Sequence, residues 1–242
     1  MAIVKDHYEN YLAKYYSWIS GGFAKKIDEN RIFFKDHHIK PCSSKIAVDL
    51  GAGSGFQSIP LAELGYKVIA IDLSETLLTE LKNNAKDLQI DIINDDLLNF
   101  SKYCPEKIEL AVCMGDSLTH LDTHQDIRHL LRRIYKALEI DGRIILTFRD
   151  LTAELKGLDR IIPVRNDDNV IFTCFVEHEN DHVKVHDIIY EKKNDRWELK
   201  KSFYKKICIS PHWTKEFLQD VGFKVETFDI HNGVVCIVAY KI

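Results

Sequence analysis

One short stretch constrains the fold of this chain more than any other. Residues 46–50 form an apolar run typical of a buried strand, and a predicted helix follows and ends near Leu64. Between them lie Gly51, Gly53 and Gly55, separated by single small residues. Glycines at a strand-to-helix turn let the backbone bend sharply and let a ligand approach the main chain. The stretch therefore predicts an α/β fold with a nucleotide-like ligand at this turn.

Strands and helices alternate beyond this turn. Helical patterns separate the apolar runs, and Ser74 is placed to cap the helix after the second run. Runs that are apolar on both faces and alternate with helices are typical of a parallel sheet covered on both sides. The further predicted strands lie at 67–71, 90–93, 110–113 and 143–148.

The pattern changes after Arg149 to long strands joined by short polar turns. Runs at 170–176, 183–190 and 197–208 are separated by turn-forming residues at 179–181 and 193–195. In the last run Trp197, Leu199, Phe203 and Ile207 share one face, and Glu198, Lys200 and Ser202 share the other. We therefore expect an antiparallel meander whose apolar face is covered and whose polar face is wet.

The expected architecture is a Rossmann-like, doubly wound, seven-stranded sheet with a C-terminal antiparallel strand and a meander inserted after the fifth strand. A helix at 211–219 and strands at 222–228 and 234–240 close the sheet. The expected units are an N-terminal helical lid (1–40), an α/β core that binds the ligand (41–150), an antiparallel cap over the substrate (151–210) and the closing helix and strand pair (211–242).

Composition argues against several classes of protein. The chain has 242 residues with 33 basic and 37 acidic side chains, a formal net charge of −4, so no global basic field favours nucleic acid or an anionic membrane. No apolar run approaches the roughly 18 residues of a spanning helix, and the first residues show no signal segment. The six cysteines and eleven histidines are scattered, so no metal site is expected. We expect a cytoplasmic protein.

The residues around the glycines distinguish two kinds of nucleotide. A dinucleotide motif requires a glycine three residues after Gly53, where this chain has Phe56. Asp49, just before the glycines, suits a ligand with an ammonium group better than a diphosphate. Asp72 ends the next strand and is placed to accept hydrogen bonds from ribose hydroxyls. These features favour S-adenosylmethionine over NAD.

Four motifs at the ends of four successive strands resemble those of class I S-adenosylmethionine-dependent methyltransferases. They are Asp49-x-Gly51-x-Gly53-x-Gly55, Asp72, Asp95-Asp96-Leu97 and the run Cys113-Met-Gly-Asp-Ser-Leu-Thr-His120. Within this class, residues 114–121 are similar to Leu-Gly-Asn-Ser-Phe-Ala-His-Leu of glycine N-methyltransferase and its small-molecule relatives. Thr147-Phe-Arg149-Asp resembles that group's Asp-His-Arg-Asn, and Pro211-His212 resembles the end of its Tyr-Tyr-Pro-His.

The resemblance implies S-adenosylmethionine as cofactor, S-adenosylhomocysteine as product, and a small-molecule acceptor methylated at nitrogen by in-line displacement under a lid. Asp96 is favoured over Asp95 for the adenine amino group, with the Leu97 N–H beside the ring; a solvated turn is the alternative for both carboxylates. Lys25 stands where the relatives have an arginine. The implied cofactor residues are Tyr8, Trp18, Lys25, Asp49, Gly51, Gly53, Gly55, Asp72, Leu73, Leu77, Asp95, Asp96, Leu97, Met114 and Gly115.

Three residues are candidates for the reaction itself. Arg149 matches the arginine that holds the substrate carboxylate in the relatives, and an ion pair with Asp150 or Glu154 is the alternative. Asp116 replaces an asparagine that faces the substrate amine; a carboxylate there can accept a proton or cap a turn. His120 is either a proton shuttle or a buried histidine.

Other functions stay open at this stage. A methyltransferase for protein or tRNA is one, although the chain shows no basic stripe for RNA. A cofactor-binding scaffold without activity and a nicotinamide-dependent dehydrogenase are the others, because a fold alone proves no chemistry. We expect no nucleic-acid or membrane partner, and we expect the meander to pack over the cofactor edge as part of the acceptor pocket.

Overall fold

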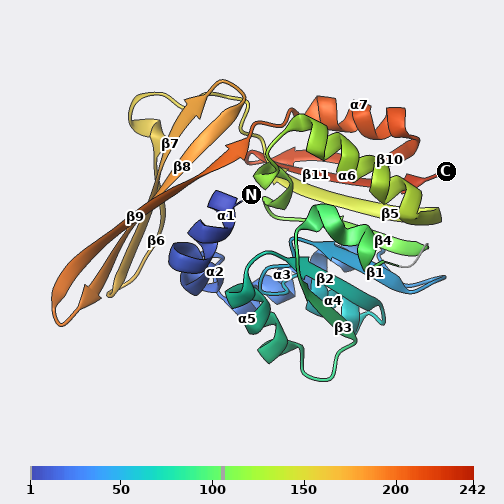
Figure 1. Ribbon diagram of the computed structural model, residues 1–242, viewed down its shortest axis with the longest axis horizontal. Helices are drawn as coiled ribbons and strands as arrows, with labels where there is room; N and C mark the ends of the chain where they lie inside the picture. Colours follow the sequence, from blue (N-terminus) through green and yellow to red (C-terminus); the bar gives the residue numbers. More distant parts are fainter. Residues whose placement is uncertain (1, 105–106) are drawn as a thin grey trace.

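Two sheets organise the computed structural model, which describes residues 2–104 and 107–242 (Figure 1). The larger has seven strands in the order β10-β11-β5-β4-β1-β2-β3. Strands β1 to β5 run parallel, and β11 is antiparallel to both neighbours, β5 and β10. This confirms the predicted fold class. The strands are β1 (Ile46–Leu50), β2 (Lys67–Asp72), β3 (Ile90–Asn94), β4 (Ile108–Cys113), β5 (Leu138–Arg149), β10 (Phe223–His231) and β11 (Val234–Lys241).

Helices cover both faces of this sheet, as strands that are apolar on both sides require. Alternate residues of one strand enter different layers: Val48 belongs to one core cluster and Ala47 to the other. Ser74 accepts a hydrogen bond from the Leu77 N–H and caps its helix as predicted. One layer contains α3 (Phe23–Asp36), α4 (Ser58–Glu63) and α5 (Glu75–Ala85), and the other contains η2 (Leu97–Lys102), α6 (His124–Ala137) and α7 (Pro211–Val221).

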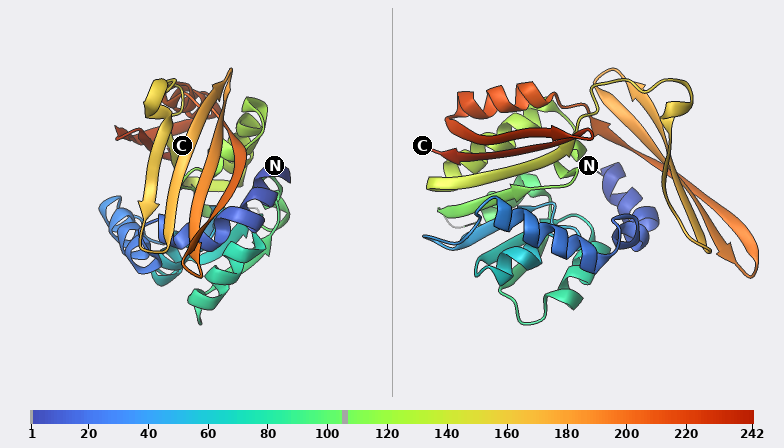
Figure 2. Two further views of the ribbon diagram at one scale, coloured as in Figure 1. Left: turned by 90° about the vertical axis from the view of Figure 1, so that its left-hand side faces the viewer. Right: turned by 180° about the vertical axis from the view of Figure 1, so that it is seen from behind.

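The N-terminal segment lies between the two sheets (Figures 1 and 2). It consists of α1 (Ala2–His7), a single π-helical stretch η1 (Tyr8–Leu12) and α2 (Ala13–Ile19). Leu12 and Tyr15 are buried against Phe172 of the smaller sheet. On the other side, Tyr16 stacks on Phe56 with ring centroids 5.6 Å apart. The segment thus joins the glycine turn to the smaller sheet.

The smaller sheet is the predicted meander with one more strand than expected. Its order is β6-β7-β8-β9, all antiparallel, and positive φ angles at Asn180 and Asn194 make the two tight turns. The extra strand was missed because Pro163 interrupts a short run, and its pairing with β7 is irregular there. The strands are β6 (Ile161–Asn166), β7 (Val170–Glu179), β8 (His182–Lys193) and β9 (Arg196–Ile207).

The expected orientation of β9 is wrong for three of its four apolar residues, and only Ile207, at the end of the strand, is buried as expected. Trp197, Leu199 and Phe203 are exposed by 46%, 51% and 42%, whereas Tyr204 and Lys206 are buried. The pairing register explains this, because it aligns Tyr204 and Lys206 with the buried valines of β8. The alternation within one strand identified two faces, but the neighbouring strand decides which face is covered.

Candidate functional site

The glycine turn folds tightly against the end of β2. The N–H groups of Gly51 and Ala52 both donate to the carbonyl of Ile71, at 2.9 and 3.0 Å. Gly51 has a φ of +81°, and a Cβ added there would lie 2.2 Å from the Oγ of Ser117. Glycine is therefore required at position 51, because the short helix η3 (Ser117–His120) that follows β4 lies against the turn.

Asp72 connects this turn to the start of α5. Its Oδ2 accepts a hydrogen bond from the Gly53 N–H at 2.9 Å, and its Oδ1 accepts one from the Ser74 N–H at 2.8 Å. Burial raises the pKa of the carboxyl group. Each oxygen keeps a further lone pair for a ligand hydroxyl. Asp72 lines a small cavity of about 70 Å³, together with Val4, Lys5, Tyr8, Tyr16, Gly51, Gly53, Leu73, Ser74, Leu77, Leu97, Ser117 and His120.

A second, much larger cavity of about 840 Å³ adjoins the first. It lies between the carboxyl ends of β4 and β5 and the inner face of the meander, which agrees with the expected position of the meander over this edge. Tyr8, Tyr16, Ser117 and His120 line both cavities. These four residues therefore mark the place where ligands in the two cavities would meet.

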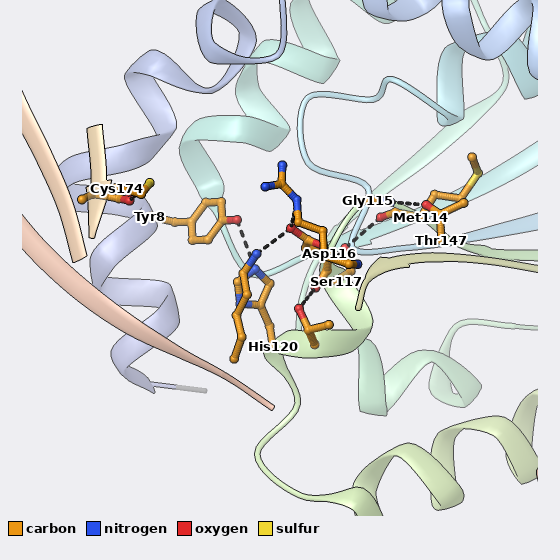
Figure 3. Close-up of polar contacts among 12 residues, drawn as sticks. Tyr8, Met114, Gly115, Asp116, Ser117, His120, Thr147 and Cys174 are labelled. Carbon is orange, nitrogen blue, oxygen red and sulfur yellow. Dashed lines mark hydrogen bonds and ion pairs between the residues drawn. The ribbon is translucent and has the colours of Figure 1, made fainter. Parts of the chain in front are cut away.

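Tyr8 and His120 face one another at this junction (Figure 3). The Tyr8 hydroxyl and His120 Nε2 are 3.2 Å apart. Burial, followed by the charge of Lys206, lowers the pKa of His120 to about 3. Burial also raises the pKa of Tyr8 well above its usual value. Both side chains are therefore neutral near pH 7, and His120 Nδ1 has no hydrogen-bond partner among the described residues.

Asp116 lies between two cations. Its Oδ2 is 2.5 Å from the Nζ of Lys206 and 3.3 Å from the Nε of Arg149, and its Oδ1 accepts the Arg149 backbone N–H at 3.0 Å. Burial alone would raise the pKa of this carboxyl group, but Lys206 and Arg149 outweigh it and hold the pKa well below its usual range. Asp116 is thus a fixed, ionised partner for the two cations.

A buried polar network ties the N-terminal segment to the meander. His7 Nε2 is 2.8 Å from Asp187 Oδ2, and His7 Nδ1 is 2.9 Å from the Ser202 hydroxyl. The thiol of Cys174 lies 3.1 Å from the other oxygen of Asp187. His7 and Asp187 are only 1% and 2% exposed. Because Tyr8 follows His7 directly, this network fixes Tyr8 over the junction of the cavities.

Several predicted cofactor residues line these cavities, and two, Gly55 and Asp49, support the glycine turn instead. Leu73, Leu77 and Leu97 line the small cavity, whereas Met114 and Gly115 line the large one. Gly55 keeps the turn close to α5, because a Cβ there would lie 2.2 Å from Leu81. Asp49 lies beneath the glycine turn and in neither cavity wall. Its Oδ2 accepts a hydrogen bond from the Ser58 hydroxyl at 2.6 Å, and burial raises its pKa to about 7.

Besides Asp49 and Gly55, four predicted cofactor residues line neither cavity: Trp18, Lys25, Asp95 and Asp96. The carbonyl oxygen of Trp18 accepts a hydrogen bond from Arg165, whose guanidinium lies over the Trp18 ring. Lys25 is exposed and pairs with Glu29 at 3.9 Å.

The two carboxylates after β3 are occupied locally. Asp95 accepts hydrogen bonds from Tyr103, Asn99 and the Asp96 N–H, which lower its pKa to about 2. Asp96 caps η2 by accepting the Leu98 N–H at 2.8 Å. Both carboxylates thus have local hydrogen-bond partners, and their contact with the adenine group stays a prediction.

Sequence reasoning missed Lys206, Tyr16 and Ser117. Lys206 was overlooked because the meander face that contains it was expected to be wet. Ser117 follows the predicted Asp116 within the same motif, and the close approach of Gly51 gives it a position at the junction. Tyr16 could have been found from its helical spacing after Tyr8 and Leu12, which places the three side chains along one side of the segment.

Within residues 2–104 and 107–242, no group of three or more His, Cys, Asp or Glu side chains is arranged to hold a metal ion. Across the same residues, no helix has the length and apolar character needed to cross a bilayer.

The described topology and turn agree with one known family. Residues 47–142 match the model of the methyltransferase domain family. A S-adenosylmethionine-dependent methyltransferase from Clostridium acetobutylicum superposes with a TM-score of 0.73 at 16% identity, covering 90% of this chain and 91% of that one. The chain therefore has the fold of the class I S-adenosylmethionine-dependent methyltransferases, and residues 47–142 match a methyltransferase domain. This methyltransferase fold accounts for the seven strands, their order and the single antiparallel strand.

Relatives of this chain include enzymes named for methylation at nitrogen. A glycine/sarcosine N-methyltransferase from Aphanothece halophytica is 31% identical over 152 residues, covering 60% of this chain and 56% of that protein. One from Parasynechococcus marenigrum is 29% identical over 121 residues, covering 49% and 43%. The chain thus spans about half of the length of these curated relatives. An amino pentose methyltransferase from Micromonospora echinaspora, solved with S-adenosylmethionine, shares the fold with a TM-score of 0.69 at 13% identity and covers 96% of this chain and 94% of that one.

Proposed function

We propose that this chain binds S-adenosylmethionine and methylates the nitrogen of a small-molecule acceptor that carries an acidic group. The observation that carries the proposal is the pair of adjoining cavities at the carboxyl edge of the sheet, one at the glycine turn and one walled by Arg149 and Lys206. Residues 1–40 would act as the lid and residues 151–210 as the cap over the acceptor. The relatives named for N-methylation support nitrogen as the acceptor atom.

The small cavity has the chemistry that S-adenosylmethionine requires. Asp72 presents a carboxylate to ribose hydroxyls, and Leu73 and Leu97 present apolar surface to a purine ring. Gly53 leaves room between Tyr16 and Leu77, where a Cβ would lie 3.6 and 3.7 Å from those side chains. Phe56 occupies the position that a dinucleotide-binding glycine would take and instead supports Tyr16. These residues would hold the cofactor at the junction.

The bound cofactor supplies a methyl group that is already activated by its sulfonium. The protein therefore has to orient the acceptor amine and exclude water. Tyr8 and the His7–Asp187 network close the junction from the N-terminal side. Arg149 offers a planar guanidinium for the acceptor's acidic group, and its ion pair with Asp116 fixes its direction.

The contacts of Asp116 favour a positioning role over the role of proton acceptor. A carboxylate that is paired with Lys206 and Arg149 is a weak base. His120, whose low pKa makes it a weak base as well, would orient a neutral amine through a hydrogen bond. We therefore propose that the acceptor amine is deprotonated when it attacks, and that no strong base of the protein takes part.

Ligand-induced thermal shifts test the proposal. S-adenosylmethionine and S-adenosylhomocysteine should each raise the melting temperature, because a ligand that binds only the folded state stabilises it, whereas NAD should not. A screen of amine acceptors by S-adenosylhomocysteine release should then find turnover among small acids. A response to NAD with none to S-adenosylhomocysteine would refute the cofactor assignment, and turnover confined to protein or tRNA would refute the acceptor class.

A further inference from the structure

The large cavity is far bigger than a free amino acid requires. Its volume of about 840 Å³ lies in the upper part of the range that encloses drug-sized ligands, roughly 300–1,000 Å³. An acceptor as small as glycine would leave most of this space to water. The size of the cavity therefore indicates an acceptor larger than glycine.

The wall formed by the meander is arranged in rows across the strands. Val176, Val185 and Tyr204 form one row, since Val176 pairs with Val185 and Val185 with Tyr204. Leu151, Leu155 and Ile162 pack against this row. All six line the cavity, so its central part is an apolar surface suited to rings or chains.

The next row has a polar group at each end. His178 pairs with Val183, and Val183 pairs with Lys206. Strands lie about 4.8 Å apart, so the backbones of His178 and Lys206 are separated by roughly 10 Å across the sheet. Lys206 reaches Asp116 near the junction, whereas His178 lies at the far end of the row.

The ring nitrogens of His178 lack hydrogen-bond partners among the described residues. Both nitrogens are buried. An imidazole nitrogen buried without a partner costs free energy, commonly about 1–3 kcal/mol. His186 on the opposite face of the same sheet shows the contrast, because its Nε2 lies 2.5 Å from Glu177. A ligand group in the cavity would supply what His178 lacks.

We infer that the acceptor is an elongated amphipathic molecule that lies across the inner face of the meander. Its amine and acidic end lies at Arg149 and Lys206, its apolar body lies on the valine rows, and a second hydrogen-bonding group at its far end reaches His178. This inference rests on the proposed function and narrows its acceptor class from small acids in general to acids with an apolar body and a polar far end.

A series of amino acids tests the inference in the protein loaded with S-adenosylhomocysteine. The probes are glycine, phenylalanine, tyrosine, 4-phenoxyphenylalanine and thyronine, and binding is measured by calorimetry. Phenylalanine should bind at least tenfold more tightly than glycine, and 4-phenoxyphenylalanine more tightly still. The probes form two pairs that differ by a terminal hydroxyl: phenylalanine with tyrosine, and 4-phenoxyphenylalanine with thyronine. In one of these pairs the hydroxylated probe should bind about fivefold more tightly than the other member, the usual effect of one hydrogen bond.

Substitutions then assign the gain to His178. In H178F the preference for the hydroxylated probe should disappear. In H178Q the preference should persist, because the amide can still form a hydrogen bond. In the control H186F the preference should equal that of the parent. V176W should weaken the two-ring probes more than tenfold. Glycine binding as tightly as the aromatic probes, or a hydroxyl preference that survives H178F, would overturn the inference.

Binding of S-adenosylhomocysteine distinguishes failure of this inference from failure of the proposed function. A protein that binds S-adenosylhomocysteine but none of the aromatic probes overturns the inference and leaves the proposed function standing. A protein that does not bind S-adenosylhomocysteine overturns the proposed function, and the inference with it.

Discussion

Asp49 makes the stability of this protein depend on pH in an unusual direction. Its carboxyl group is 1% exposed, and only one of its two oxygens has a hydrogen-bond partner among the described residues, the Ser58 hydroxyl. Burial raises its pKa from 3.8 to about 7. Between these values the folded protein holds a proton that the unfolded chain has lost, so stability falls as the pH rises from about 4 to 7.

The size of the effect follows from the shift. One pKa unit corresponds to about 1.36 kcal/mol, so ionised Asp49 costs the folded state on the order of 4 kcal/mol above pH 7. The variant D49N keeps an oxygen for the Ser58 hydroxyl and cannot ionise. The free energy of unfolding of D49N minus that of the parent should therefore rise by about 2–3 kcal/mol from pH 5 to pH 8 and then level off.

Urea unfolding at pH 5, 6, 7 and 8 measures this difference. D95N is the matched control, because hydrogen bonds from Tyr103 and Asn99 lower the pKa of Asp95 to about 2. The stabilisation from ionised Asp95 is fully present above the pKa of the unfolded chain and is lost only in stronger acid. The free energy of unfolding of D95N minus that of the parent should therefore be constant from pH 5 to pH 8. The reasoning about Asp49 is wrong if D49N shows the same flat profile.

Three further substitutions probe the two cavities. D72A should weaken S-adenosylhomocysteine binding by roughly 1.5–3 kcal/mol, and the exposed control D91A should not; equal losses would contradict the ribose role. R149K should lower kcat/KM for an acidic acceptor by roughly 1.5–3 kcal/mol and leave cofactor affinity unchanged. Full activity of R149A on such acceptors would refute the role of Arg149 in binding the acidic group. K206M should destabilise the fold by on the order of 2 kcal/mol, and no more because Arg149 still faces Asp116. The double variant K206M/D116N should recover most of that stability; an equal loss in the double variant would contradict the buried pair.

Most of the larger sheet could be predicted from the sequence because its signals are local. Each strand is a short apolar run beside its own helix, and the glycines at 51–55 fix a turn whose shape depends on neighbouring residues. The order of parallel strands then follows from the family that these motifs resemble. The turns at Asn180 and Asn194 were predictable for the same reason, since left-handed backbone at asparagine is a local preference.

The remaining features depend on contacts between distant segments. Which face of β9 is buried is set by its pairing with β8, and Lys206 enters the site only as a result of that pairing. The family resemblance implies a place for Trp18 near the cofactor, but Arg165 contacts its carbonyl and ring and holds it on the meander side. Lys25 likewise turns outward to Glu29, because α3 presents that side to solvent.

Asp116 and its two cations lead to a last prediction, on the charge of the acceptor. Lys206 and Arg149 together carry one more positive charge than Asp116 removes, and Lys206 is only 8% exposed. Lys206 has Asp116 as its counter-ion, so the excess charge lies on Arg149, whose side chain is 64% exposed. A guanidinium that is free to form charge-assisted hydrogen bonds should make the cavity prefer an acidic ligand to a neutral one.

The comparison of phenylalanine with phenylalaninamide measures this preference directly, because the two differ in the acidic group alone. In the complex with S-adenosylhomocysteine, the acid should bind at least fivefold more tightly than the amide, in keeping with a hydrogen bond to a charged group. D116N removes the negative charge and leaves both cations, so the same ratio should increase. If the amide binds the parent as tightly as the acid, the cations serve only to hold Asp116, and Arg149 is a structural ion pair rather than a ligand for the acceptor.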